Sequence, residues 1–327
     1  NILLYNSIER FDLDIKKSAG LIMHPTALPS KYGIGDFGET SRNFIDFLNE
    51  SSTNIWQVLP LGLTSLDEFS PYSSPSSILG NRYLVDIEKL TKYEKIDIVS
   101  PQFSNDFVQY KDVYKFKDDI FKNVSKNINL QDKIFTSFLD DDLIKKHITF
   151  LILKDLNQKS WNEWDNVYQD YSDDLFDKLI IENTELVNFH VLTQYEFFNQ
   201  WKSLKKYAND KNVQILGDIP IYVNHDSADV WLNKEMFELD ETGNMELVSG
   251  AVPDSFNTEG QIWGNALYRW DLHKEDNFKY WKEKLNKSLN LYDYLRIDHF
   301  IGFFKYWSIP KGESALNGYW REGPRFD

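Results

Sequence analysis

The residues of this chain with the strongest chemical character are Arg296, Asp298 and His299, which lie in the tetrapeptide Arg296-Ile297-Asp298-His299. They close a short apolar segment, residues 292–297, that predicts a buried β-strand. Because side chains alternate between the two faces of a strand, Arg296 and Asp298 are expected on the same face. An ion pair on a buried face is costly, so it indicates either a satisfied structural salt bridge or a carboxylate kept ionised for catalysis by the neighbouring guanidinium. The tetrapeptide by itself leaves both interpretations open.

Four short apolar segments are available to position such residues. They cover residues 20–23, 55–59, 213–216 and 292–297, and each ends in a polar turn or in a turn that contains Gly or Pro. Residues 36–50, 189–206 and 277–290, which lie between them, carry apolar side chains at helical spacing. This alternation predicts parallel βαβ units whose strands are covered on both faces. The carboxyl ends of such strands meet at one edge, where barrel enzymes carry their active sites.

Further candidates lie in turns and loops of the chain. Asp218 follows the third apolar segment, where it either caps the next element or takes part in chemistry. Tyr72 lies in Ser70-Pro71-Tyr72, which is also compatible with a simple turn. Residues 252–265 are too polar and Gly-rich for a core, yet they contain Phe256 and Trp263. Two aromatic side chains in such a loop predict a lid that stacks on a sugar ring.

The composition of the chain narrows the class of partners. The net charge of -15 and the pI near 4.9 argue against binding to nucleic acids or anionic membranes, which requires basic patches. No uninterrupted apolar run long enough for a transmembrane helix occurs, and residues 1–17 lack the pattern of a secretory signal, so we expect a cytoplasmic protein. The chain has no Cys, and its 6 His are scattered without metal-ligand spacing. We therefore expect neither disulfides nor a metal site.

Several longer motifs occur together in this sequence. From about residue 20 to residue 327 the chain resembles the 4-α-glucanotransferases (amylomaltases or disproportionating enzymes) of glycoside hydrolase family 77. The motifs that carry the resemblance are His24-Pro25-Thr26-Ala27-Leu28-Pro29-Ser30, Trp56-Gln57-Val58-Leu59-Pro60-Leu61-Gly62, Ser70-Pro71-Tyr72, Gly217-Asp218-Ile219-Pro220-Ile221, Gly264-Asn265, Leu267-Tyr268-Arg269-Trp270-Asp271 and Arg296-Ile297-Asp298-His299-Phe300.

The resemblance implies an α/β fold, a (β/α)8 barrel with insertions, of which this sequence holds about the first half of the strands. Residues 1–63 are then the first strands and helix, and residues 64–103 a loop-rich insertion at the active-site face. Residues 104–185 are predicted to form a mostly helical insertion. Residues 186–327 continue the barrel with the lid loop and the strand of the nucleophile.

The resemblance also implies a reaction. Segments of α-1,4-glucan would be transferred between maltooligosaccharides, amylose or glycogen-type glucans, without a cofactor and with retention of the anomeric configuration. Asp298 matches the nucleophile of the family, and Arg296 would keep that carboxylate ionised and oriented. The residues implied in substrate binding are Tyr72, as a platform under the ring at the cleavage point, and Asp218, Asp254, Phe256, Trp263, Asn265 and His299. The oligomeric state is left open.

The chain departs from the family pattern in one important respect. In the family, the acid/base Glu follows the next barrel strand in a segment like Ala-Glu-Asp-Leu-Gly, and a third essential Asp comes later in a His-Asp pair. Neither segment follows Asp298 in this sequence, and Glu313 and Glu322 are expected in a loop, so neither is assigned as the acid. We therefore expect residues 1–327 alone to be inactive. Two alternatives stay open: an α-glucan hydrolase on the same fold, and a shortened relative that binds glucan without turning it over.

Overall fold

The computed structural model describes residues 17–64 and 68–325 of the chain. The opening segment, for which the sequence predicts no secretory signal, lies outside the described residues except for Lys17. Within the described ranges, no helix is both long enough and apolar enough to cross a bilayer.

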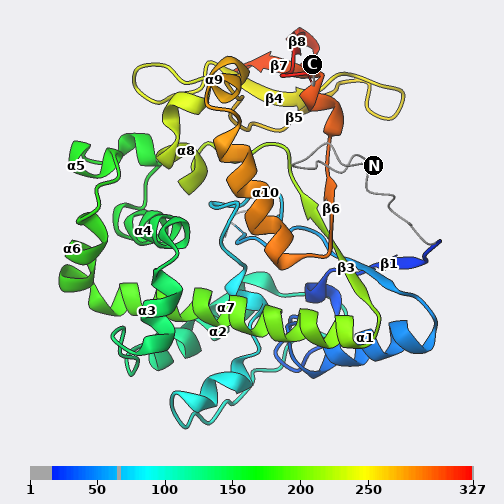
Figure 1. Ribbon diagram of the computed structural model, residues 1–327, viewed down its shortest axis with the longest axis vertical. Coiled ribbons are helices and arrows are strands. Elements are labelled where there is room, and N and C mark those ends of the chain that lie inside the picture. Colours follow the sequence, from blue (N-terminus) through cyan, green and yellow to red (C-terminus); the bar gives the residue numbers. More distant parts are fainter. Residues whose placement is uncertain (1–16, 65–67, 326–327) are drawn as a thin grey trace.

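Four strands form one parallel sheet, and parts of the predicted motifs lie on these strands (Figure 1). Neighbouring strands are parallel, with Ile22 opposite Gln57, Gln57 opposite Leu216, and Asp218 opposite Arg296. The four predicted strands and their parallel arrangement are thereby confirmed, as expected for about half of a (β/α)8 barrel. In their order across the sheet, the strands are β1 (Gly20–Ile22), β2 (Ile55–Gln57), β3 (Gln214–Ile219) and β6 (Tyr294–Ile297).

The three helices predicted between these strands are present. They are α1 (Glu39–Glu50), α7 (Thr184–Asp210) and α10 (Lys279–Leu291). Helix α1 buries Ile45 and Leu48, which are three residues apart and therefore lie on one face. Helix α7 extends beyond the predicted residues 189–206 at both ends and runs across the lower part of the view in Figure 1. Its length lets it pack against α1, the parallel sheet and the helical segment that precedes it.

Residues 104–185 contain a group of helices that packs on α7, at the left of Figure 1. The described part of residues 64–103 holds short 3-10 turns, at Arg82–Leu84 and Ile87–Lys92, and neither a strand nor an α-helix. Side chains from all four predicted segments enter one hydrophobic core, so the boundaries at 63, 103 and 185 stay predictions. The helices are α2 (Tyr110–Ser125), α3 (Lys133–Leu139), α4 (Asp142–Asn157), α5 (Asn166–Gln169) and α6 (Leu175–Glu182).

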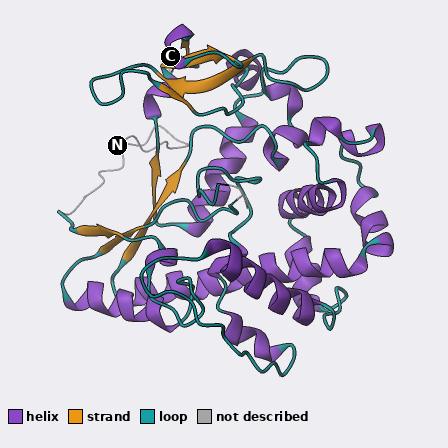
Figure 2. Cartoon of the chain, turned by 180° about the vertical axis from the view of Figure 1, so that it is seen from behind, coloured by secondary structure: helices purple, strands orange, loops and turns teal. Residues whose placement is uncertain are grey.

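A second sheet, which the sequence did not predict, lies at the top of the views in Figures 1 and 2. It is antiparallel, in the order β5 (Gln261–Ile262), β4 (Leu247–Ala251), β7 (Lys305–Pro310) and β8 (Tyr319–Glu322). The expectation that Glu322 lies in a loop is wrong, because Glu322 ends β8 and pairs with Lys305. Glu313 lies between β7 and β8. Two short helices connect strands of the two sheets in the sequence. Helix α8 (Ala228–Leu232) lies between β3 and β4, and helix α9 (Trp270–Glu275) lies between β5 and α10.

The expectation that all four parallel strands are buried on both faces is also wrong. Along β6, Tyr294 and Arg296 are exposed, whereas Leu295 and Ile297 are partly buried against the core. All three residues of β1 are exposed. Both strands are edges of the described sheet. The Arg296 side chain is therefore partly accessible, whereas its partner Asp218 is buried.

Candidate active site

The centre of the site is a guanidinium that bridges two carboxylates at the ends of neighbouring strands. Arg296 lies opposite Asp218 in the parallel pairing of β6 with β3. Its Nη1 donates to Oδ1 of Asp218 at 2.7 Å, and its Nη2 donates to Oδ1 of Asp298. Partial burial works against the charge of Arg296, but the hydrogen bond to Asp218 and the negative charges of both carboxylates raise its pKa above the ordinary value. The arrangement fixes two acidic side chains relative to each other through one cation.

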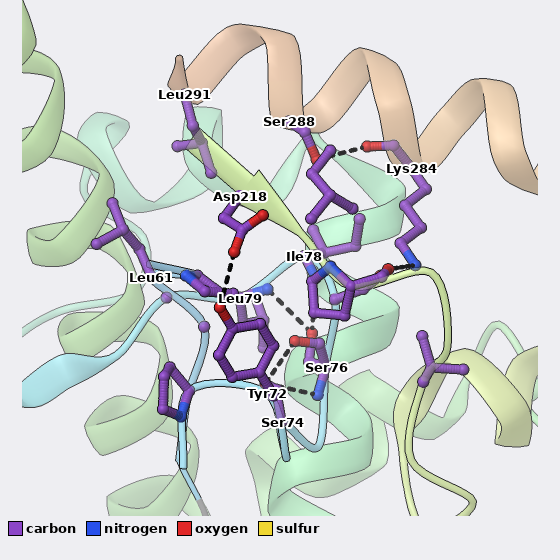
Figure 3. A pocket seen from close by; sticks show the side chains of 18 of the residues that line it. Leu61, Tyr72, Ser74, Ser76, Ile78, Leu79, Asp218, Lys284, Ser288 and Leu291 are labelled. Atoms are coloured by element: carbon purple, nitrogen blue, oxygen red, sulfur yellow. Dashed lines mark hydrogen bonds between the residues drawn. The ribbon is translucent and has the colours of Figure 1, made fainter. Parts of the chain in front are cut away.

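Asp218 is fully engaged by its neighbours. Its side chain is 1% exposed, and its second oxygen, Oδ2, accepts a hydrogen bond of 2.7 Å from the hydroxyl of Tyr72 (Figure 3). Burial of the phenol, together with this hydrogen bond, raises the pKa of Tyr72 well above its ordinary value. Tyr72 therefore stays protonated as a donor, and the residue as a whole is 38% exposed. This contact joins residues 146 positions apart in the sequence.

Asp298 differs from Asp218 in being accessible. Its side chain is 42% exposed, and among the described residues only its Oδ1 has a hydrogen-bond partner, Arg296. The backbone N–H of Asp298 donates to the carbonyl of Ile219 at 3.0 Å, which extends the pairing with β3 by one residue. The next residue, His299, adopts a left-handed conformation with φ of 52° and turns the chain away from the strand. Asp298 is thus oriented by its neighbours, with Oδ2 left open to a reacting group.

Aromatic rings from the segments that follow β3, β5 and β6 pack together beside this carboxylate. The ring of Trp263 packs edge-to-face on that of His299, with centroids 4.7 Å apart, and Tyr222 lies 6.3 Å from Trp263 and 6.5 Å from His299. Burial lowers the pKa of His299, an effect that the charge of Asp298 opposes. Its Nε2 is buried without a hydrogen-bond partner among the described residues. His299 is therefore a neutral, packed group beside Asp298 at pH 7.

Other predicted residues lie in the loop between β4 and α9. Asn265 donates from Nδ2 to Asn224 at 3.2 Å and accepts from the hydroxyl of Ser249 at 3.2 Å, so it joins this loop to the chain after β3. Asp254 accepts from the backbone N–H groups of Phe256 and Asn257 at 2.8 and 2.7 Å and shapes its own turn. The ring of Phe256 is 97% exposed.

The structure therefore brings together most of the residues that the sequence singled out. Asp254 and Phe256 are the exceptions, because they project from the exposed part of the loop. Hydrogen bonds join Arg296 to Asp218 and Asp298, and Asp218 to Tyr72. His299 follows Asp298 and packs on Trp263, and Asn265 is hydrogen-bonded to Asn224, which lines a cavity together with Tyr72 and Asp218.

A small cavity lies against Tyr72 and Asp218 (Figure 3). Its volume is about 60 Å³. The cavity is also lined by Tyr222, Asn224 and Lys284, which sequence reasoning did not assign to the site. Tyr222 directly follows the motif that contains Asp218, a position that could have singled it out. In the ranges that the structure describes, no group of three or more His, Asp or Glu side chains is placed to hold a metal ion.

Parallel strands that end in bridged carboxylates beside an aromatic loop are typical of barrel enzymes that act on glycosidic bonds. The model of glycoside hydrolase family 77, described as 4-alpha-glucanotransferase, matches residues 23–327, and the chain belongs to this family.

Individual relatives agree with this assignment. The chain is 41% identical over 313 residues to a 4-alpha-glucanotransferase of Clostridium butyricum, covering 92% of this chain and 64% of the relative. It is 37% identical over 311 residues to the 4-alpha-glucanotransferase of Aquifex aeolicus strain VF5, covering 94% and 64%. A solved structure of amylomaltase from Streptococcus agalactiae in complex with acarbose superposes with a TM-score of 0.86 at 36% identity, covering 94% of this chain and 65% of that one. The chain thus spans about 64% of the length of the curated relatives that it matches.

Proposed function

We propose that the protein is a cytoplasmic 4-α-glucanotransferase of carbohydrate metabolism that moves α-1,4-glucan segments between maltooligosaccharides. Membership of glycoside hydrolase family 77 supports the substrate class, as does the acarbose complex of the similar amylomaltase. The observation that carries the proposal is the position of Asp298, which is oriented by Arg296 at a strand end and is open at Oδ2. A nucleophile needs this combination of fixed direction and access.

The reaction would proceed in two displacements. Oδ2 of Asp298 attacks the anomeric carbon of the donor, and the glycosidic oxygen leaves with a proton from an acid. The 4-hydroxyl of an acceptor sugar then attacks the same carbon, gives its proton to that residue, and releases the carboxylate of Asp298. Two inversions at one carbon return the original configuration.

Asp218 is not suited to act as that acid. Both of its oxygens are engaged, one by the Arg296 guanidinium and the other by the Tyr72 hydroxyl, which is a donor. Neither oxygen is therefore free to reach the leaving oxygen of a substrate. We therefore assign Asp218 to positioning Arg296 and Tyr72, and not to the acid.

The remaining site residues have roles in holding the sugar. Tyr72, which is partly exposed, would lie under the ring at the cleavage point, since aromatic faces stack on the apolar side of glucose. Trp263 and Phe256 would close over the acceptor and keep water from the glycosyl-enzyme, with Asp254 and Asn265 shaping their loop. The ring of His299 packs against the ring of Trp263, and His299 directly follows the nucleophile in the sequence.

Product analysis with the complete protein tests this proposal. With maltotriose as the only substrate, a transferase yields glucose and a ladder of longer oligosaccharides without a net gain in reducing ends. A net gain in reducing ends would instead identify an α-glucan hydrolase. Binding of acarbose without any turnover would identify a non-catalytic glucan-binding protein. The Asp298→Asn variant is the control, and we expect it to lose activity by several orders of magnitude.

A further inference from the structure

The loop that carries Tyr72 is held by a buried carboxylate that lies outside the site described above. Asp229, on α8, is 1% exposed. Its Oδ2 accepts from the backbone N–H of Ser77 at 2.8 Å, and its Oδ1 accepts from the Ser77 hydroxyl. The hydroxyl of Tyr280, on α10, also donates to Oδ1, at 3.0 Å. One carboxylate thus joins the loop to two helices, and three donors stabilise its charge.

A buried lysine links the same region to the strand end of Asp218. Lys284, one turn after Tyr280 on α10, is 3% exposed, and its Nζ donates to the carbonyl of Pro220 at 3.0 Å. Burial lowers the pKa of Lys284 to about 8, an effect that the negative charge of Asp229 opposes. Lys284 and Ser77 both line the cavity against Tyr72 and Asp218, as the position of Lys284 in Figure 3 illustrates. Helix α10 therefore holds the loop, through Asp229, and the chain after β3, through Lys284.

The loop has other anchors besides Ser77, some from its backbone and one from the side chain of Ser76. Gly80 exchanges two hydrogen bonds of 2.9 Å with the side-chain amide of Gln194 on α7. The hydroxyl of Ser76 lies 2.7 Å from Nδ1 of the buried His147 on α4 and also accepts from the N–H of Leu79. The carbonyl of Pro75 accepts from the N–H of Ala228 at 2.9 Å. In contrast to these anchors, Ser77 binds the carboxylate of Asp229 on α8.

We propose that Asp229 is a positioning residue for Tyr72. By binding Ser77, Asp229 fixes the position of the loop. In this position the Tyr72 hydroxyl donates to Oδ2 of Asp218 and the Tyr72 ring faces the sugar. Asp229 does not touch the substrate in this account, which rests on the proposed transferase function. The helical elements of the chain thereby determine the geometry of the sugar platform, although they are remote from the nucleophile along the sequence.

The single variant that isolates this role is Ser77→Ala. It removes the hydroxyl donor to Asp229 and leaves the backbone donor, so the loop keeps its fold and loses part of its constraint. We expect kcat to fall about tenfold, since small misplacement of a positioning group reduces rate more than binding. The matched control is Ser125→Ala, which removes a buried hydroxyl that donates to the carbonyl of Lys122 within helix α2. It should lower the melting temperature and leave kcat within twofold of the wild type.

The decisive test combines Ser77→Ala with Tyr72→Ala in a double-mutant cycle on the complete protein, with maltotriose as substrate. If Asp229 acts through Tyr72, Ser77→Ala lowers kcat about tenfold in the wild-type background and less than twofold in the Tyr72→Ala background. An equal loss in both backgrounds, or no loss in a Ser77→Ala variant of normal melting temperature, overturns the proposal. A wild-type protein without transferase activity would count against the proposed function instead, so the two failures are distinguishable.

Discussion

Replacing Arg296 by lysine should show how much of the activity depends on the bridge between the two carboxylates, because lysine keeps the positive charge and loses the bridge. The guanidinium reaches Asp218 with Nη1 and Asp298 with Nη2. A lysine supplies the same charge from one nitrogen and cannot hold two carboxylates in a fixed fork. Because Asp218 is buried and Asp298 is accessible, we expect the lysine to stay with Asp218 and release Asp298.

The size of the effect follows from the contacts. A hydrogen bond to a charged group contributes about 1.5–3 kcal/mol, and the lower end applies here because the Arg296 side chain is 45% exposed. Loss of the hydrogen bond to Asp298 should then raise the activation free energy by about 1.5 kcal/mol, and misalignment of the nucleophile should raise it by a similar amount. At about 1.4 kcal/mol for each tenfold, kcat should fall roughly 10²-fold. Stability should change by less than about 1 kcal/mol, as is usual for exposed ion pairs.

The assay is the initial rate of glucose release from maltotriose, combined with the melting temperature of each variant. Arg321→Lys is the matched control, because Arg321 forms a similar partly exposed pair with Glu238 between the second sheet and the preceding loop. It should leave kcat within about threefold of the wild type. An Arg296→Lys variant with the same kcat as Arg321→Lys would show that the bridge has no part in orienting Asp298.

Three further predictions follow from the structure. Tyr72→Ala and Trp263→Ala should each lower activity on maltotriose, with Tyr72→Ala also costing stability because Asp218 loses a donor, and a stability loss with unaltered kinetics would contradict the binding role. Burial lowers the pKa of His24 to about 4 from 6.5, so the folded state binds its proton less readily and stability falls as the pH drops from 6.5 to 4. Over that pH range, chemical denaturation should show that the free energy of unfolding falls by up to about 3 kcal/mol more for the wild type than for His24→Gln. An equal dependence of this free energy on pH in both proteins would refute the lowered pKa of His24. Residues 1–327 expressed alone should give no glucose or longer oligosaccharides from maltotriose, since no carboxyl group among the described residues is assigned as the proton donor for the leaving group, and transfer at the rate of a full-length relative would refute this expectation.

Local sequence patterns were sufficient for the parallel half of the fold. The strands are short apolar runs that stop at polar, Gly or Pro turns, and the helices have clear apolar faces, as in α1 with Ile45 and Leu48. The antiparallel sheet was missed because its pairings are long-range. Strand β4 pairs with β7 across about sixty residues, with Leu247 opposite Pro310, and β5 has only two residues, Gln261 and Ile262. No local periodicity can indicate such pairings.

The candidate site shows the same division. Strand alternation alone predicted that Arg296 and Asp298 share a face, and their side chains do meet. The burial expected for this face was wrong, since exposure depends on which elements cover it. The contact of Tyr72 with Asp218 and the link from Ser77 to Asp229 join residues 146 and 152 positions apart, which only the folded chain reveals.

The most direct test of the central claim, that Asp298 is the nucleophile of a retaining transfer, is to trap the covalent intermediate. The complete protein is incubated with a fluorinated maltosyl fluoride, which glycosylates a retaining enzyme faster than it is released, and the digested protein is analysed by mass spectrometry. We predict one glycosylated peptide, with the sugar on the side chain of Asp298, and no label in Asp298→Asn. A label on Asp218 or on another carboxylate, or turnover of maltotriose without any trapped sugar, would contradict the account.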